Sequence, residues 1–102
     1  MEQIARWTTP SFFFKPKAVA VGAVDQIYLV IKQSGTVVIS KSLADATVTD
    51  KFTWTLTQAD TGGLSTEMPA IAKIDYLSNG IRYTTAAKQY EVVNSAKNGV
   101  IT

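Results

Sequence analysis

The chain has no cysteine and no histidine among its 102 residues. Without cysteine, neither a disulfide framework nor a thiolate zinc site is possible. Without histidine, the commonest general acid/base and metal ligand is missing, and so are the Ser-His and Cys-His nucleophile systems. The glycines form neither a phosphate-binding loop nor a dinucleotide fingerprint, and the carboxylates lack calcium-loop spacing. The sequence therefore predicts a protein that is not an enzyme and holds no cofactor or metal.

Strong charge and long apolar runs are also absent. Ten basic residues balance eight acidic ones to a net charge of +2, which does not favour nucleic-acid binding. The longest apolar run, residues 18–24, is too short to span a bilayer, and residues 1–6 do not have the pattern of a secretory signal. We therefore expect no membrane insertion and a protein made and folded in the cytoplasm. Hydrophobic residues make up 46% of the chain, which favours one packed domain over residues 1–102.

Among the features that the sequence does have, residues 52–57 are the most informative segment. Phe52, Trp54 and Leu56 alternate with three threonines. Because successive strand residues point to opposite faces, this pattern predicts a half-buried strand with Trp54 in the core. A ligand-stacking role for Trp54 is the less favoured alternative.

Similar short strands are predicted along the rest of the chain. Asn79-Gly80 and Ser34-Gly35 are typical hairpin turns, and Thr57 with Asp60 resembles a capping box for one helical turn that Gly62-Gly63 ends. A short extended segment is expected at Val19 and Val21, and Val100 and Ile101 are expected to dock. The predicted strands are residues 11–15, 26–33, 36–40, 46–49, 52–57, 70–77 and 81–87, with residues 90–93 continuing the last past an irregularity near 87–88.

This spacing predicts an all-β fold. Turn signals every 8–12 residues between about seven short strands are typical of an antiparallel two-sheet β-sandwich, immunoglobulin-like in outline. We expect an extended N-terminal arm at residues 1–9.

Aromatic residues near the N-terminus form the candidate interface. Trp7 lies outside the alternating strands, and Phe12, Phe13 and Phe14 precede basic residues. Contact with nucleic acid or membrane is one interpretation, but two lysines make a weak electrostatic footprint. A strand that is partly core and partly docked on a partner is favoured. Removing residues 1–9 is then expected to weaken association and leave the sandwich folded.

Several segments together resemble small β-sandwich proteins of phages and prophages of Gram-positive bacteria. The matching pieces are Thr8-Thr9-Pro10 before an aromatic strand, residues 26–35, the sequence Trp-Thr-Leu-Thr-Gln-Ala-Asp-Thr at 54–61, Asn79-Gly80, and residues 98–101. Their order is similar to the N-terminal modules of phage baseplate proteins, both upper baseplate and receptor-binding. Such families have no catalytic residues to carry over, so the resemblance implies a structural role.

The functional expectation is a tail- or baseplate-associated structural protein. Its expected partners are other virion proteins or further copies of itself, and its expected location is the virion, assembled in the host cytoplasm. The alternative is a carbohydrate- or cell-surface-binding module. That alternative needs exposed aromatics on one sheet face, and the available tyrosines are Tyr28, Tyr76, Tyr83 and Tyr90.

Overall fold

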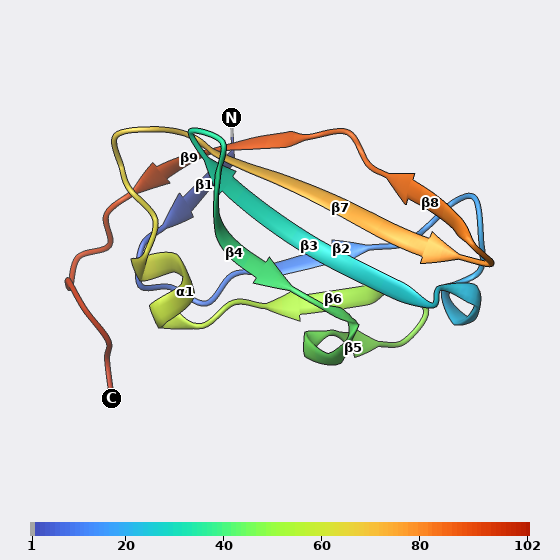
Figure 1. Cartoon of the computed structure of the whole chain (residues 1–102). Helices are drawn as coiled ribbons and strands as arrows, with labels where there is room; N and C mark the ends of the chain where they lie inside the picture. The colour runs from blue at the N-terminus through green and yellow to red at the C-terminus, as the bar shows by residue number, and fades with distance from the viewer. Residues whose placement is uncertain (1) are drawn as a thin grey trace.

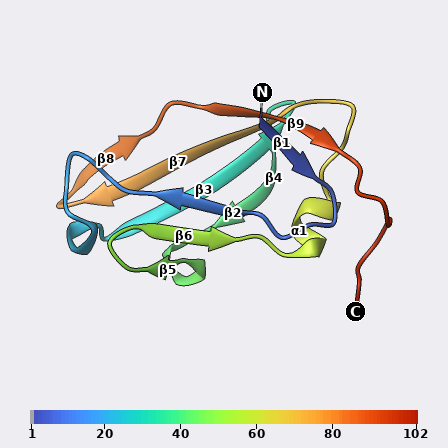
Figure 2. The same ribbon diagram turned by 180° about the vertical axis from the view of Figure 1, so that it is seen from behind.

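Two β-sheets make up the computed structural model, which describes residues 2–102 (Figures 1 and 2). Strands account for 47% of the chain and helices for 11%, which confirms the all-β, two-sheet prediction. The strands are β1 (Glu2–Ala5), β2 (Ser11–Phe14), β3 (Gln26–Gln33), β4 (Thr36–Lys41), β5 (Thr47–Val48), β6 (Phe52–Thr55), β7 (Ala70–Ser78), β8 (Ile81–Thr84) and β9 (Lys88–Val93). The helices are α1 (Gln58–Gly62) and two 3-10 turns, Val21–Ala23 and Leu43–Asp45.

The larger sheet has the strand order β1-β9-β7-β3-β4, with β8 also paired to β7. β8 and β9 lie along the same side of β7, and the residues between them interrupt the pairing. Thr85 covers that interruption, because its backbone N–H donates to the Ile74 carbonyl and its hydroxyl accepts from the Ile74 N–H. The smaller sheet has the order β2-β6-β5.

The core lies between the two sheets. Ile27, Leu29 and Ile31 of β3 point inward and meet Phe52 and Trp54 of β6, and all are essentially inaccessible to solvent. Trp54 is 1% exposed, and its indole N–H donates to the Ser42 carbonyl at 3.0 Å, so its predicted core position is confirmed. Burying both the ring and its donor in this way is what a core tryptophan requires.

Local sequence signals account for the connections. Ser34 and Gly35, like Asn79 and Gly80, have positive φ, as two-residue hairpin turns with the right-handed strand twist require. Thr57 caps α1 through the predicted capping box: its hydroxyl accepts from the Asp60 N–H, and its own N–H donates to the Asp60 carboxylate.

Some predictions were wrong. The described chain contains nine strands rather than about seven, because β1 was not foreseen and the expected irregularity falls at residues 85–87 and divides the last strand into β8 and β9. The larger sheet is not purely antiparallel, since β1 pairs with β9 in parallel. Residues 2–5 therefore belong to the sheet and are not an arm, because the buried Ile4 anchors them in the core.

Two short segments also differ from expectation. Val21 lies in a 3-10 turn rather than an extended segment. Val100 and Ile101 remain exposed, and the tail is held instead by its backbone, because the Gln58 amide bonds both the N–H and the carbonyl of Ile101.

Candidate interaction surfaces

Trp7 lies at the corner between β1 and β2 and is half-buried. Its backbone has φ 64°, which is uncommon for a bulky residue. The indole ring packs directly on Gly62 of α1, and its N–H donates to the Asn98 side chain at 2.8 Å. The Arg6 guanidinium lies 5.7 Å from the ring centroid. Trp7 therefore joins the N-terminal corner, α1 and the C-terminal segment within the same chain.

The three phenylalanines of β2 divide between the two faces of the smaller sheet. Phe12 and Phe14 point into the sandwich, where Phe12 meets Tyr90 edge-on at 5.6 Å and Phe14 meets Tyr76 at 5.5 Å. Phe13 points outward and is 62% exposed. The structure thus does not gather Trp7 and the phenylalanines into one surface, and Phe13 alone of the four is exposed.

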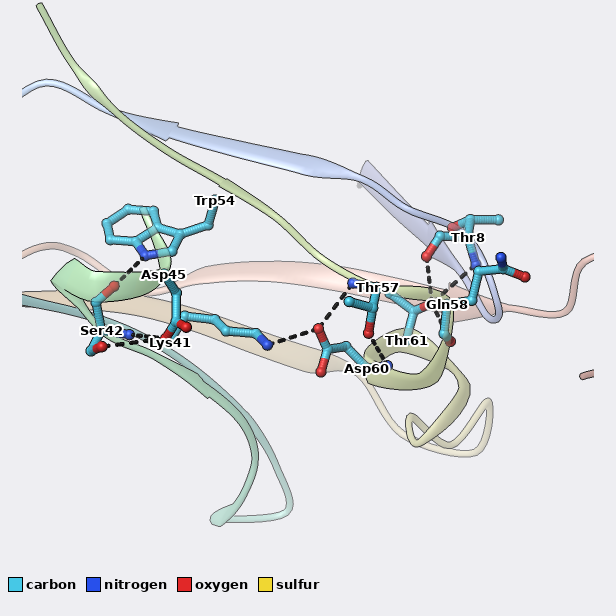
Figure 3. A network of polar contacts seen from close by, with 9 residues as sticks. All are labelled: Thr8, Lys41, Ser42, Asp45, Trp54, Thr57, Gln58, Asp60 and Thr61. Carbon is cyan, nitrogen blue, oxygen red and sulfur yellow. Dashed lines mark hydrogen bonds and ion pairs between the residues drawn. The ribbon is translucent and has the colours of Figure 1, made fainter. Parts of the chain in front are cut away.

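A polar network holds α1 against the edge strand β4 (Figure 3). The Lys41 ammonium lies 2.9 Å from the Asp60 carboxylate, at the end of β4. Burial by itself raises the pKa of Asp60, but the hydrogen bonds from Thr57 and Lys41 outweigh it and hold that pKa below its usual value. At the other end of α1, the Thr61 hydroxyl donates to the Thr8 carbonyl and accepts from its N–H. This network joins elements of both sheets through side chains that serve structure.

The outer face of the larger sheet carries apolar side chains, of which the sequence prediction singled out Tyr28 alone. Tyr28 and Val30 of β3 and Ile71 and Leu77 of β7 point away from the core, and we call these four residues the outer apolar patch. Tyr28 is 44% exposed, and Ile71 and Leu77 are exposed to a similar degree. The sequence could have indicated this outer surface, because β3 and β7 both have apolar residues at outward-facing as well as inward-facing positions.

The outer apolar patch borders a shallow hollow of about 400 Å³. Tyr28, Val30 and Leu77 line it together with Gln26 and Arg82. Asp75, beside them, accepts hydrogen bonds from Thr84 and from Arg82, and these bonds hold its pKa below the usual value. The hollow therefore combines one exposed aromatic ring with fixed polar groups.

The other tyrosines do not add to an aromatic platform. Tyr76 and Tyr90 are buried, and Tyr83 stacks on Tyr76 at 4.9 Å between ring centroids. Burial raises the pKa of Tyr90. Tyr28 is therefore the exposed tyrosine of the four.

Within residues 2–102, acidic side chains do not gather into a group of three or more that would hold a metal ion. In the same part of the chain, no helix is long and apolar enough to cross a membrane. Comparison with known proteins finds no matching family model, curated protein or solved structure.

Proposed function

We propose that this chain is a non-enzymatic phage or prophage structural protein, associated with the tail or baseplate, that acts through protein–protein assembly. The observation that carries the assembly role is the outer apolar patch. Exposed apolar side chains on one sheet face are typical of surfaces that another protein covers, and here Lys73 and Asp75 lie between Ile71 and Leu77 on the same face of β7. The sequence resemblance to small virion β-sandwich proteins supports the phage context.

The strand order supports an immunoglobulin-like outline of the variable type. β2-β6-β5 corresponds to strands B, E and D of such a domain, and β9-β7-β3-β4 corresponds to G, F, C and C′. The outer apolar patch then lies on strands C and F. In this arrangement the sandwich is the scaffold and its faces and edges carry the function.

Self-association and partner binding test the proposal directly. Tyr28→Lys with Ile71→Lys places two charges in the outer apolar patch, and Val48→Lys is the matched control because Val48 is equally exposed on the smaller sheet. We expect the patch variant to weaken association at least about tenfold, since unpaired charge at an interface core is costly, and the control to leave it unchanged. The measurement is sedimentation velocity over a concentration series, alone and with the products of neighbouring genes. A chain that stays monomeric and binds none of those products does not have an assembly role.

The hollow beside Tyr28 favours a second candidate, a carbohydrate- or cell-surface-binding module. An exposed aromatic ring next to the Gln26 amide and the Arg82 guanidinium has the components of a sugar subsite. Titration calorimetry with host cell-wall polysaccharide tests this candidate. Saturable binding that Tyr28→Ala abolishes would favour it over assembly, and absence of heat would exclude it for that polysaccharide.

A further inference from the structure

One edge of the smaller sheet has no strand beside it. β2 pairs with β6 on one side, and no strand of residues 2–102 pairs with its other side. In an immunoglobulin-like sandwich the first strand can occupy that place, but here the first strand, β1, pairs with β9 in the other sheet. The position beside β2 is therefore vacant within the described chain.

The register shows which backbone groups face this vacant position. The Leu56 N–H donates to the Pro10 carbonyl, so residues 10 and 56 form a hydrogen-bonded pair. In an antiparallel ladder such pairs alternate with pairs that share no hydrogen bond. Phe12 therefore bonds to β6, whereas the N–H and C=O groups of Ser11 and Phe13 point outward to the free edge.

A cavity of about 450 Å³ opens beside this edge, between the two sheets. Its floor is apolar and includes Phe12, Leu29, Ile74 and Tyr90, together with Ile4 of β1. A free strand edge beside an apolar cavity is the geometry of strand addition: the backbone supplies hydrogen bonds and the cavity accepts an alternate side chain of the added strand.

The charges at the rim decide which strand fits best. Lys73 and Lys88 line the cavity, and Lys15 follows the end of β2, whereas Glu2 is the acidic residue of the lining. Glu2 pairs with Lys88 at 3.0 Å, and this pairing raises the pKa of Lys88. The lining thus carries two lysines and one glutamate, a net charge of +1, with Lys73 outside the Glu2–Lys88 ion pair. A second copy would bring the same lysines to the contact, whereas an acidic strand would complement them.

We propose that the β2 edge is a strand-acceptor site for an extended acidic segment of another protein, which pairs with the backbone of Ser11 and Phe13 and places an apolar side chain in the cavity. This proposal deepens the assembly function and rests on it. The backbone edge of β2 is distinct from the outer apolar patch, and although Lys73 lies opposite Val30 of that patch, variants at Ser11 change the edge alone, so the two can fail separately.

The test uses a nine-residue synthetic peptide that alternates Glu or Asp with Val or Leu, and a comparator with Lys in place of the acids. Ser11→Pro removes the outward N–H, which an edge strand tolerates, and Ser11→Ala is the matched control that keeps it. We expect the acidic peptide to bind, the comparator to bind less tightly, and Ser11→Pro to weaken binding about fivefold or more, the effect of one backbone hydrogen bond. Hydrogen exchange at Ser11 and Phe13 should slow when the peptide is bound.

Several outcomes would overturn the proposal. These are no binding of the acidic peptide, equal binding of the comparator, or equal binding by Ser11→Pro and Ser11→Ala. Self-association that Ser11→Pro abolishes would identify a second copy as the occupant instead. If Ser11→Pro does not fold, Lys88→Glu replaces it, because Lys88 lines the cavity and lies opposite the inward-facing Ala72, and weaker acidic-peptide binding is expected. Loss of gene-product binding in the Tyr28→Lys, Ile71→Lys variant, with no effect of Ser11→Pro, would leave the assembly role standing and remove the strand-acceptor site.

Discussion

Trp7 and Gly62 form the most constrained contact at the scale of single residues. A bulky residue with positive φ costs about 1–3 kcal/mol and persists only where its surroundings enforce it. Here the ring lies on Gly62, its N–H is bonded to Asn98, and the next residue, Thr8, is bonded to Thr61. A Cβ at position 62 would overlap the ring, so glycine at this position is required by space.

Gly62→Ala is therefore predicted to destabilise the protein by about 1–3 kcal/mol, the usual cost of overpacking. Gly63→Ala is the matched control, because a Cβ there meets only ordinary contacts, the nearest at 3.5 Å. Urea unfolding followed by tryptophan fluorescence measures both. Equal midpoints for the two variants would contradict the close packing of Trp7 on Gly62.

Trp54→Ala is predicted to cost about 3–5 kcal/mol, since it leaves a large cavity and also removes the donor to Ser42. Because small domains have about 5–15 kcal/mol in total, the variant should be strongly destabilised. Thr55→Ala, on the exposed face of the same strand, serves as the control. An unchanged denaturant midpoint for Trp54→Ala would contradict the core position.

At the scale of elements, α1 shows how a short helix is held by its ends. It has only five residues, and helices of that length are unstable alone. The Thr57–Asp60 capping box, the Lys41–Asp60 ion pair and the Thr61–Thr8 bonds supply what the helix itself lacks. Asp60 takes part in the first two contacts.

Acid should weaken this arrangement. The folded pKa of Asp60 lies below its unfolded value near 3.8, so its contribution is present above that pH and is lost as the pH falls through the folded pKa. Asp60→Asn keeps the shape but not the charge. We expect it to lower stability by about 0.5–2 kcal/mol at neutral pH and to reduce the loss of stability on acidification. Unfolding midpoints from pH 7 to pH 2 measure this, and Glu67→Gln, an exposed carboxylate outside α1, should not reproduce it.

Local elements were predictable from the sequence where their signals are local. The bounds of β3 agree with the prediction because alternation and the Ser34-Gly35 turn both define it, and α1 follows from its capping box. β1 was not predictable, because its partner β9 lies at the other end of the chain and Ile4 is its one buried residue. Alternation along β2 predicts that Phe12 and Phe13 lie on opposite faces of the sheet. Because both faces then carry aromatic side chains, alternation alone does not predict which face is buried.

At the scale of the whole molecule, the parallel pairing of β1 with β9 brings the first and last strands together. Ile4 is buried within the core that both sheets share. Residues 2–5 are therefore part of the folded unit, so we now predict that residues 1–9 are needed for full stability.

Removal of residues 1–9 is predicted to cost at least about 2–5 kcal/mol, the loss expected for one buried aliphatic side chain alone. Removal of residues 99–102 is the matched control, since Val100 and Ile101 are exposed. Calorimetric melting of both truncated proteins provides the measurement. If the protein lacking residues 1–9 melted at the same temperature as the full-length protein, β1 would contribute nothing to the stability of the fold.

The same pairing has a mechanical consequence. Because β1 and β9 run in parallel, tension applied between the two ends of the chain slides one strand along the other and loads their hydrogen bonds together, whereas an antiparallel hairpin pulled open at one end breaks them in turn. Single-molecule pulling through terminal handles should therefore meet a high rupture force, and the protein lacking residues 1–9 should extend at a lower one. A protein pulled through its two termini would thus carry load through Glu2–Ala5 and β9, with the rest of the sandwich shielded behind them.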